Sequence, residues 1–343
     1  MTTAGRASAG EGAVDLEGAP PIPGLVARRP DTALDFPAIA ELVTAANVYD
    51  RFDYIPTAEQ LEHQWRLTPG FEPGRDALLV ELDGDLAGLA RVTWRERSGK
   101  VVHQLEIVVH PANRRRRIGT ALLGWAEGQA RASVLEGAGG PSDLPHFLGG
   151  WADLGVGGVP EFVARHGYEP IRYFHLMLRD LTAPITNVPL PSGLEVRPVR
   201  GADHRRIWDA DVEAFEDHFE AGVRSEEDFV AFFTEPDVDT ALWQVAWDGD
   251  AVAGSVMNAI HPHENDVLGQ RRGWLEHVSV RRPWRGRGLA SALIGRSLEL
   301  LRDRGLDEAA LGVDSANPTG ALRVYERMGF VVHQTAATYR KAS

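Results

Sequence analysis

The chain has 343 residues, and at roughly 150 residues per domain this length predicts two domains. The composition, 43% hydrophobic and 25% charged, is typical of a folded globular protein, and the absence of cysteine excludes disulfides, thiolate metal sites and a cysteine nucleophile. The net charge of −13 argues against nucleic acid or an anionic membrane as a partner. No segment approaches the roughly 18 consecutive apolar residues of a membrane span, and a cysteine-free chain fits the reducing cytoplasm.

Two stretches rich in proline and glycine divide the chain. Residues 1–24 are small and polar and lack the apolar core of a signal peptide, so they predict a flexible tail. Residues 181–193, LTAPITNVPLPSG, carry three prolines and almost no charge, which is typical of an interdomain linker. We therefore expect one domain over residues 25–180 and a second over residues 194–343.

The two halves of the chain resemble each other at nearly constant separations. Residues that open a strand, form a hairpin turn or begin and end a helix recur in the same order. The matched positions are Gly24 and Gly193, Gly84 and Gly249, Gly119 and Ala290, and Gly167 and Gly329. Ordered matches of this kind indicate the duplication of one domain.

The elements of the second copy follow an α/β order. The pattern predicts a strand at 194–199, acidic helices within 203–233, strands at 241–247, 251–260 and 274–280, a helix at 289–304, a strand at 309–314, a helix at 318–328 and terminal strands. Asn317 and Pro318 are typical of the N-cap and the first residue of the last helix, and Gly329 ends it. The expected fold is α/β, with a mixed sheet.

The most informative segment is the turn that leads from the strand ending at Val280 into the next helix. Gly286 and Gly288 lie there beside Arg285 and Arg287. The backbone N–H groups of such a turn, with the positive end of the helix dipole, can bind a pyrophosphate, and glycine lets the phosphate approach the backbone. A Rossmann turn has its glycines nearer the strand, and a Walker loop ends in Gly-Lys-Ser/Thr, so neither fits. A purely structural strand-to-helix turn remains the alternative.

The residues around this turn resemble the GCN5-related N-acetyltransferase (GNAT) family. Arg285, Gly288 and Ala290 fit its Arg-x-x-Gly-x-Ala pattern, and Asn317 and the segment ALRVYERMGF at 321–330 follow in the right order. The first copy resembles the family more weakly, and a duplicated chain of this length looks like the tandem acetyltransferases that include mycothiol synthase. The resemblance implies two tandem GNAT-type domains, each a mixed, mostly antiparallel sheet flanked by helices, with acetyl-CoA as the cofactor.

The resemblance also implies where acetyl-CoA binds. The pyrophosphate is expected on residues 285–290, the pantetheine arm against the edge of the preceding strand, and the thioester oxygen on the backbone N–H of Val278. The cofactor-binding residues implied in this way are Val278, Val280, Arg285, Gly286, Arg287, Gly288, Leu289, Ala290 and Asn317. An ordinary N-cap is the other role open to Asn317, and the two roles are compatible.

Acetyl transfer to an amine needs a base for the ammonium proton and an acid for the departing thiolate. Tyr325 matches the acid of the family by position, although its spacing also fits a core aromatic residue. Glu276, two residues before Val278, is the expected base and would act through water. Members of the family differ in the position of the base. The residue two positions earlier is Trp274, and the alternatives are His277, Glu264 and Asp266.

The first copy lacks the residues that this chemistry requires. In the matches given above, Arg117 occupies the position of Gly288, and Val163 occupies that of Tyr325. A different register over residues 116–121 restores Arg-x-x-Gly-x-Ala but loses the flanking matches. We therefore expect the first copy to be catalytically degenerate, whether or not it binds CoA.

The acceptor is expected to contact the acidic segment 203–239, because the first helices of GNAT domains line the acceptor site. Carboxylates far outnumber arginines there and would attract a cationic amine, such as an aminoglycoside-like or amino-sugar compound. The candidate contacts are Glu216, Asp217 and His218. Solvated helix faces on an acidic protein are the alternative explanation.

The favoured function is therefore N-acetylation of a primary amine on a small cationic metabolite or antibiotic, by a monomer or homodimer. The alternatives are acetylation of a desacetylated thiol-sugar, as in mycothiol synthesis, and a non-catalytic acyl-CoA-binding regulatory module. No metal site is expected, because His261, His263 and Glu264 lie in an expected hairpin loop with unsuitable spacing. The run at 114–117 lacks the interleaved aromatic residues of a nucleic-acid site.

Overall fold

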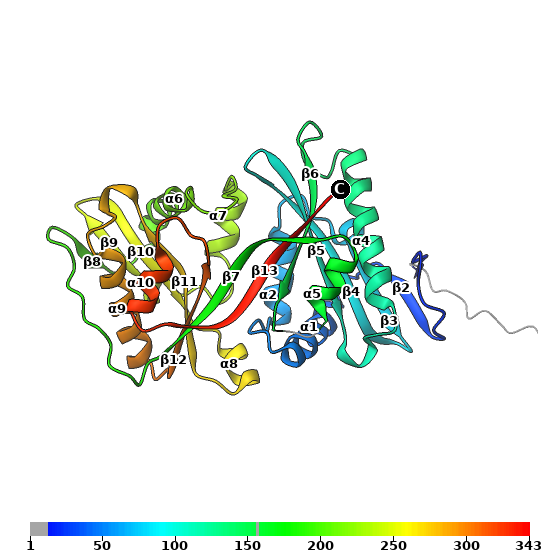
Figure 1. The fold of residues 1–343 in the computed structure, drawn as a ribbon, viewed down its shortest axis with the longest axis horizontal. Coiled ribbons are helices and arrows are strands. Elements are labelled where there is room, and N and C mark those ends of the chain that lie inside the picture. Colours follow the sequence, from blue (N-terminus) through cyan, green and yellow to red (C-terminus); the bar gives the residue numbers. More distant parts are fainter. Residues whose placement is uncertain (1–12, 156–157) are drawn as a thin grey trace, which may run out of the picture. The chain divides into compact units, whose positions relative to one another are not determined.

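The computed structural model describes residues 13–155 and 158–343 (Figure 1). Residues 1–12 of the expected tail lie outside the described residues. The chain divides into two compact units, Met1–Gly150 with Lys341–Ser343, and Trp151–Arg340. These are referred to below as the first unit and the second unit.

The first unit is built on a mixed sheet with the strand order β1-β2-β3-β4-β5-β6. Neighbouring strands are antiparallel except for β5 and β6, which are parallel. The strands are β1 (Ala13–Val14), β2 (Leu25–Arg28), β3 (Ala77–Leu82), β4 (Asp85–Arg97), β5 (Lys100–Val109) and β6 (His146–Asp153); the helices are α1 (Phe36–Asp50), α2 (Ala58–Leu67), α3 (Pro73–Asp76) and α4 (Ile118–Leu135). Phe36, Ile39 and Trp65 of α1 and α2 pack with Leu79 and Leu89 of the sheet in one core cluster.

Residues 13–24 differ from the expected tail. Ala13 lies opposite Arg28 in the antiparallel pair β1-β2, and only 6% of Leu16 is exposed. Strand pairing and the burial of a leucine side chain order this segment, although its composition is that of a tail. The first folded unit therefore begins before residue 25.

The second unit has a mixed sheet with the strand order β13-β7-β12-β11-β10-β9-β8. Its strands are β7 (Glu169–Asp180), β8 (Glu195–Arg197), β9 (Gln244–Asp248), β10 (Ala251–Ala259), β11 (Arg272–Val280), β12 (Glu308–Asp314) and β13 (Val331–Ala342). Its helices are α5 (Val159–Arg165), α6 (His204–Phe215), α7 (Glu226–Phe233), α8 (Pro262–Leu268), α9 (Leu289–Asp303) and α10 (Ala321–Arg327). The α/β class and the mixed sheet predicted from the sequence are confirmed.

Strand β7 precedes the expected linker in the chain but belongs to the sheet of the second unit. It pairs antiparallel with β12, where Asp180 lies opposite Glu308, and antiparallel with β13, where Leu178 lies opposite Val331 (Figure 1). The compact division after Gly150 therefore differs from the boundary expected at 181–193. Composition marks a linker, whereas hydrogen bonding assigns a strand to its sheet.

Helices cover both faces of the second sheet because side chains alternate along its strands. On β10, Val252 and Met257 belong to the core cluster that includes Ile207 of α6. Ala253 and Val256 of the same strand belong to the cluster that includes residues of α9. The sheet is thus covered by α6 on one face and by α9 on the other.

The helix expected at 289–304 is present as α9. The segment around His261 and His263, expected to be a hairpin loop, is instead the short helix α8, which has Pro262 as its first residue. None of the helices within the described ranges is long and apolar enough to cross a membrane.

The helix expected at 318–328 begins later, as α10, and its N-cap is Gly320 with φ 74°. Asn317 is therefore not the N-cap. Its Oδ1 accepts hydrogen bonds from the backbone N–H of Thr319 at 2.8 Å and from the hydroxyl of Thr319 at 2.6 Å. These hydrogen bonds form an Asx turn that precedes α10.

Candidate functional site

The site begins where two parallel strands of the second sheet separate. The paired residues of β11 and β12 are Arg272 with Glu308, Gly273 with Ala309 and Trp274 with Ala310, and the pairing recorded for these strands ends there. The rest of β11, through Val280, has β10 on one side and an open edge on the other. An extended ligand can pair with such an edge as an additional strand would.

A β-bulge lies within β11 at Glu276. In the pairing with β10, Met257 lies opposite His277 and Asn258 lies opposite Leu275, so Glu276 is the extra residue. A strand without a bulge would place Glu276 and Val278 on one face, as the sequence led us to expect. The bulge interrupts this alternation and redirects the Glu276 side chain.

The open edge presents two backbone N–H groups. The N–H of Arg281 donates to the carbonyl of Ala253 on β10 at 3.1 Å. Hydrogen-bonded and non-hydrogen-bonded pairs alternate in an antiparallel ladder, so Val280 and Val278, opposite Gly254 and Val256, direct their N–H groups away from β10. These are the groups expected to pair with the pantetheine arm and to donate to the thioester oxygen.

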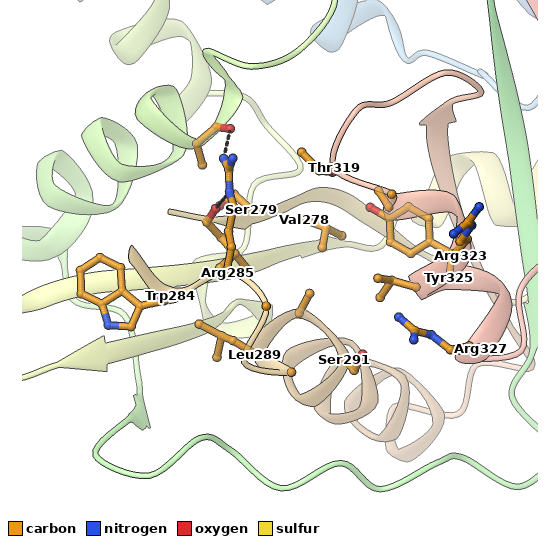
Figure 2. Close-up of a pocket in the computed structure, with 18 of the residues that line it drawn as sticks. Val278, Ser279, Trp284, Arg285, Leu289, Ser291, Thr319, Arg323, Tyr325 and Arg327 are labelled. Carbon is orange, nitrogen blue, oxygen red and sulfur yellow. Dashed lines mark hydrogen bonds between the residues drawn. The ribbon is translucent and has the colours of Figure 1, made fainter. Parts of the chain in front are cut away.

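A cavity of about 960 Å³ opens beside this edge, between β11, the first turn of α9 and α10 (Figure 2). Gly286 and Gly288 have φ values of 72° and 84°, a region that favours glycine, and a Cβ atom at either would meet no atom within 4 Å. Backbone conformation therefore favours glycine at these positions, and the space over them is open to a ligand. The predicted residues that line the cavity are His218, Val278, Val280, Arg285, Gly286, Gly288, Leu289, Ala290 and Tyr325.

Five predicted residues are not among the described residues that line this cavity. They are Glu216, Asp217, Glu276, Arg287 and Asn317. Asn317 forms the Asx turn described above, and the lining of the cavity next to it comes from Thr319 and Gly320. The side chain of Glu216 is 56% exposed and lies 3.4 Å from Arg282.

Arg285 lines the cavity and also has a structural role in the turn. Its Nε donates to the carbonyl of Val280 at 2.8 Å, and one Nη atom donates to the carbonyl of Ala214 at 3.1 Å (Figure 2). The other Nη atom donates to Asp217 at 2.6 Å. Arg282 also binds Asp217, at 2.7 Å, and the two guanidinium groups hold the pKa of the Asp217 carboxyl well below its usual range. Arg285 thus fastens the end of α6 to the turn, and Asp217 has its charge balanced within the protein.

Tyr325 lies on α10 and is 7% exposed. Its ring centroid is 6.1 Å from that of Phe330, and its hydroxyl is turned toward the strand that carries Val278 (Figure 2). Burial raises the pKa of Tyr325 to about 12, so the hydroxyl keeps its proton at neutral pH. The core packing and the catalytic position considered for this residue are therefore both compatible with its placement.

Glu276 forms the end of a chain of three charged groups. Its carboxylate lies 3.1 Å from Nε2 of His261, and Nδ1 of His261 lies 3.2 Å from the carboxylate of Asp237. Burial alone would lower the pKa of His261, but the hydrogen bond and charge of Glu276, together with Asp237 and Glu264, raise it to about 9. His261 is thus a cation at neutral pH and holds the half-exposed Glu276 side chain in place.

Two histidines near the site differ in state. Nδ1 of His277 lies 2.8 Å from Asp211 of α6, and this carboxylate outweighs burial and raises the pKa of His277. His218 lines the cavity, its ring centroid lies 4.2 Å from that of Phe215, and burial lowers its pKa. His218 is therefore a neutral imidazole at the cavity wall.

Sequence reasoning missed two arginines of α10 that line the cavity, Arg323 and Arg327. They lie two residues before and after Tyr325, four positions apart, so a helical reading of 321–328 could have placed them on one face. Ser291 and Thr319 also line the cavity and were missed.

The equivalent turn of the first unit keeps its geometry without its glycines. Nε of Arg114 donates to the carbonyl of Val109 at 3.1 Å, and its Nη1 lies 2.6 Å from Asp50, as Arg285 does with Val280 and Asp217. Arg115 and Arg117 have φ values of 61° and 70° and so occupy the positions of Gly286 and Gly288. The register that places Arg117 at the position of Gly288 is thereby supported, and the alternative over 116–121 is not.

The model of the Acetyltransferase (GNAT) family matches residues 38–138 and again residues 205–330. The chain belongs to the GNAT family. It carries two GNAT regions in tandem and is an N-acetyltransferase that uses acetyl-CoA, as the repeat and the motifs predicted.

Two curated relatives match this GNAT protein over nearly the whole length of both chains. Mycothiol acetyltransferase of Geodermatophilus obscurus is 34% identical over 309 residues, which are 89% of this chain and 94% of that protein. Mycothiol acetyltransferase of Salinispora arenicola is 31% identical over 90% of this chain and 95% of that protein.

Solved structures show the same fold. The GCN5-related N-acetyltransferase from Sphaerobacter thermophilus has a TM-score of 0.69 and 29% identity, with 93% of this chain and 96% of that chain covered. A tandem GNAT protein from the clavulanic acid biosynthesis pathway has a TM-score of 0.66 over 93% of this chain and 98% of that chain. At 17% identity, the second likeness concerns the fold alone.

Proposed function

We propose that this GNAT protein acetylates the primary amine of a desacetylated thiol-sugar and so completes mycothiol. The observation that carries this proposal is the similarity to mycothiol acetyltransferases at 31–34% identity over about nine tenths of both chains. The match covers both GNAT regions of the chain, and this extent is what supports the proposal of the same acceptor.

The structure weakens the main argument for a polycationic acceptor, which was the excess of carboxylates in the segment 203–239. The carboxylates of the segment 203–239 were expected to form an anionic wall, but most of them are paired with cations of the protein itself. Asp203, Glu213, Glu216, Asp217, Glu220 and Glu226 lie next to arginines, and Asp211 and Asp237 lie next to histidines. Paired carboxylates attract a polycation weakly, which favours the thiol-sugar.

The residues of the cavity fit acetyl-CoA as the donor. The turn before α9 offers backbone N–H groups at a helix N-terminus for the pyrophosphate, and the edge of β11 offers those of Val278 and Val280. Acetyl-CoA supplies the acetyl group as an activated thioester. The N–H of Val278 would donate to the carbonyl oxygen as negative charge develops there.

Two side chains would move the protons. Glu276 would accept the ammonium proton of the acceptor through a water molecule, held in position by His261. Tyr325 would donate its hydroxyl proton to the departing thiolate, since it keeps that proton at neutral pH and faces the strand of Val278 (Figure 2). As the C–N bond forms and the C–S bond breaks, the amine nitrogen would lose its second proton, and this proton would restore the Tyr325 hydroxyl. The products are the amide and the thiol of CoA, and the proton taken by Glu276 would pass to solvent.

Thiol release from acetyl-CoA tests this proposal. The desacetylated thiol-sugar should support turnover, and a panel of aminoglycosides and simple amino sugars should not. Tyr325→Phe keeps the ring in its buried place and should lower kcat by about 10²–10⁴ with little change in the binding of CoA. Turnover with cationic amines but not with the thiol-sugar would support the small cationic acceptor predicted from the sequence instead. Tight CoA binding without acetylation of any amine would support a regulatory module.

A further inference from the structure

Two arginines of α10 face the cavity and have no counter-ion among the residues that the structure describes. Arg323 and Arg327 line it on either side of Tyr325 in the chain, and the guanidinium of Arg327 is directed toward the first turn of α9, where Ser291 lies (Figure 2). Neither arginine has an ion pair with any residue in the described part of the chain. Glu326 also lines the cavity but forms no ion pair with them among the described residues.

This placement contrasts with that of the arginines nearer the turn. Arg282 and Arg285 share the carboxylate of Asp217, and Arg285 also donates to two backbone carbonyls. Their positive charge is balanced by the protein. The cations that remain available to a ligand in the cavity are therefore those of α10.

The helix dipole favours a cation in the last turn of α10, where Arg327 lies, but it gives no such reason for Arg323. Residues four apart on a helix are neighbours, and a pair of like charges there destabilises the helix. Arg323 and Arg327 form such a pair in an acidic protein that could have balanced them. An anion bound between the two guanidinium groups would remove the repulsion and use both of them.

The chemistry of CoA offers two kinds of phosphate. Each phosphate of the pyrophosphate is a diester with one charge, and the backbone N–H groups at the start of α9 suit it. The 3′-phosphate of the ribose is a monoester, close to a dianion at neutral pH, with three free oxygen atoms. Paired guanidinium groups match a phosphate dianion, because each can donate two parallel hydrogen bonds.

We propose that Arg323 and Arg327 bind the ribose 3′-phosphate of CoA and thereby select CoA over its 3′-dephospho form. The proposal rests on acetyl-CoA as the donor and is independent of the identity of the acceptor. It assigns a specificity site for the donor to α10, the helix that also carries Tyr325.

Binding to the full-length protein, measured by calorimetry with CoA and with 3′-dephospho-CoA, tests the proposal without turnover. The wild-type protein should bind CoA at least about tenfold more tightly, as expected for one or two charge-assisted hydrogen bonds. The double variant Arg323→Gln/Arg327→Gln should bind the two ligands equally. Arg302→Gln, which changes an exposed arginine in the last turn of α9, is the matched control and should keep the preference.

Kinetics separate this site from the catalytic residues. With any amine that the wild-type protein acetylates, the double variant should have a higher KM for acetyl-CoA and a kcat within about twofold of the wild-type value. The reason is that the 3′-phosphate is bound equally in the ground state and the transition state. Equal affinity of the wild-type protein for both ligands, or a preference that survives in the double variant, would overturn the assignment. Failure of the thiol-sugar as acceptor would leave these binding results unaffected.

Discussion

At the scale of single residues, the position of each titratable group relative to its neighbours decides its role. Glu276 and Glu216 are both exposed carboxylates of the second unit, and the sequence predicts the first as the base and the second as a contact of the acceptor. Glu276 is the residue that the bulge of β11 directs toward His261, whereas Glu216 lies beside Arg282. The geometry therefore keeps Glu276 as the candidate base and removes Glu216 from the set of free charges.

The His261 cluster predicts a pH dependence of stability. Folding raises the pKa of His261 from 6.5 to about 9, so the folded state holds this proton more tightly than the unfolded state. The stabilisation is then fully present below pH 6.5 and is lost as the pH rises to 9. We expect about 1 kcal/mol in this window, because solvent screens the half-exposed Glu276.

Chemical denaturation at pH 6 and pH 9 measures this effect. The loss of unfolding free energy between the two values should be smaller in His261→Gln than in the wild-type protein. His263→Gln, at an exposed position of the same helix, is the control and should behave like the wild-type protein. An identical loss in His261→Gln and in the wild-type protein would contradict the role given to Glu276 and Asp237.

At the scale of elements, the strand-to-helix turn has the same geometry in the two units but is built from different residues. Both turns have an arginine that binds a carboxylate and a strand carbonyl, and both have two residues with positive φ. The second unit uses glycine at these two positions, and the first uses Arg115 and Arg117. An L-residue in this region is strained by about 1–2 kcal/mol. The turn of the first unit therefore has the same backbone conformation as that of the second, although its arginines are strained in it.

The two turns should respond to substitution in opposite directions. Arg117→Gly should raise the unfolding free energy by about 0.5–1 kcal/mol, because the relief of strain exceeds the entropy that glycine loses on folding. Gly288→Ala should lower it by about 1 kcal/mol. Thermal and denaturant unfolding of the full chain measures both effects.

Arg116→Gly provides the matched control, because Arg116 is not among the residues with positive φ. It should not gain stability. If Arg116→Gly and Arg117→Gly shifted the transition equally, the strain assigned to Arg117 would be absent.

At the scale of the whole molecule, the place of β7 in the second sheet determines which fragments of the chain can fold. β7 lies between β12 and β13, and Met177 and Leu181 of this segment are no more than 1% exposed in the core of the second unit. A fragment of residues 194–343 lacks this strand and leaves two strand edges and a gap in the core. We expect the fragment of residues 151–343, which contains β7, to form the acetyl-CoA site and the fragment of residues 194–343 not to form it.

Expression of the two fragments tests this boundary. The fragment 151–343 should unfold cooperatively and bind CoA, and the fragment 194–343 should do neither. Circular dichroism during heating and calorimetry with CoA are the measurements. Cooperative unfolding of 194–343 would place the boundary at the proline-rich stretch 181–193 instead.

The sequence alone determined the duplication, the α/β class, the cavity turn at 285–290 and the position of Tyr325, because these depend on local spacing and on residues near one another in the chain. The tertiary structure decided the sheet to which β7 belongs, the delayed start of α10 and the direction of Glu276 after the bulge. It also decided which charges are free: Arg285 and Asp217 neutralise each other across 68 positions of the chain, whereas Arg323 and Arg327 do not find partners among the described residues. Hydrogen bonds and ion pairs between distant residues leave no periodic trace in a sequence, and these contacts fix the charge that a ligand meets.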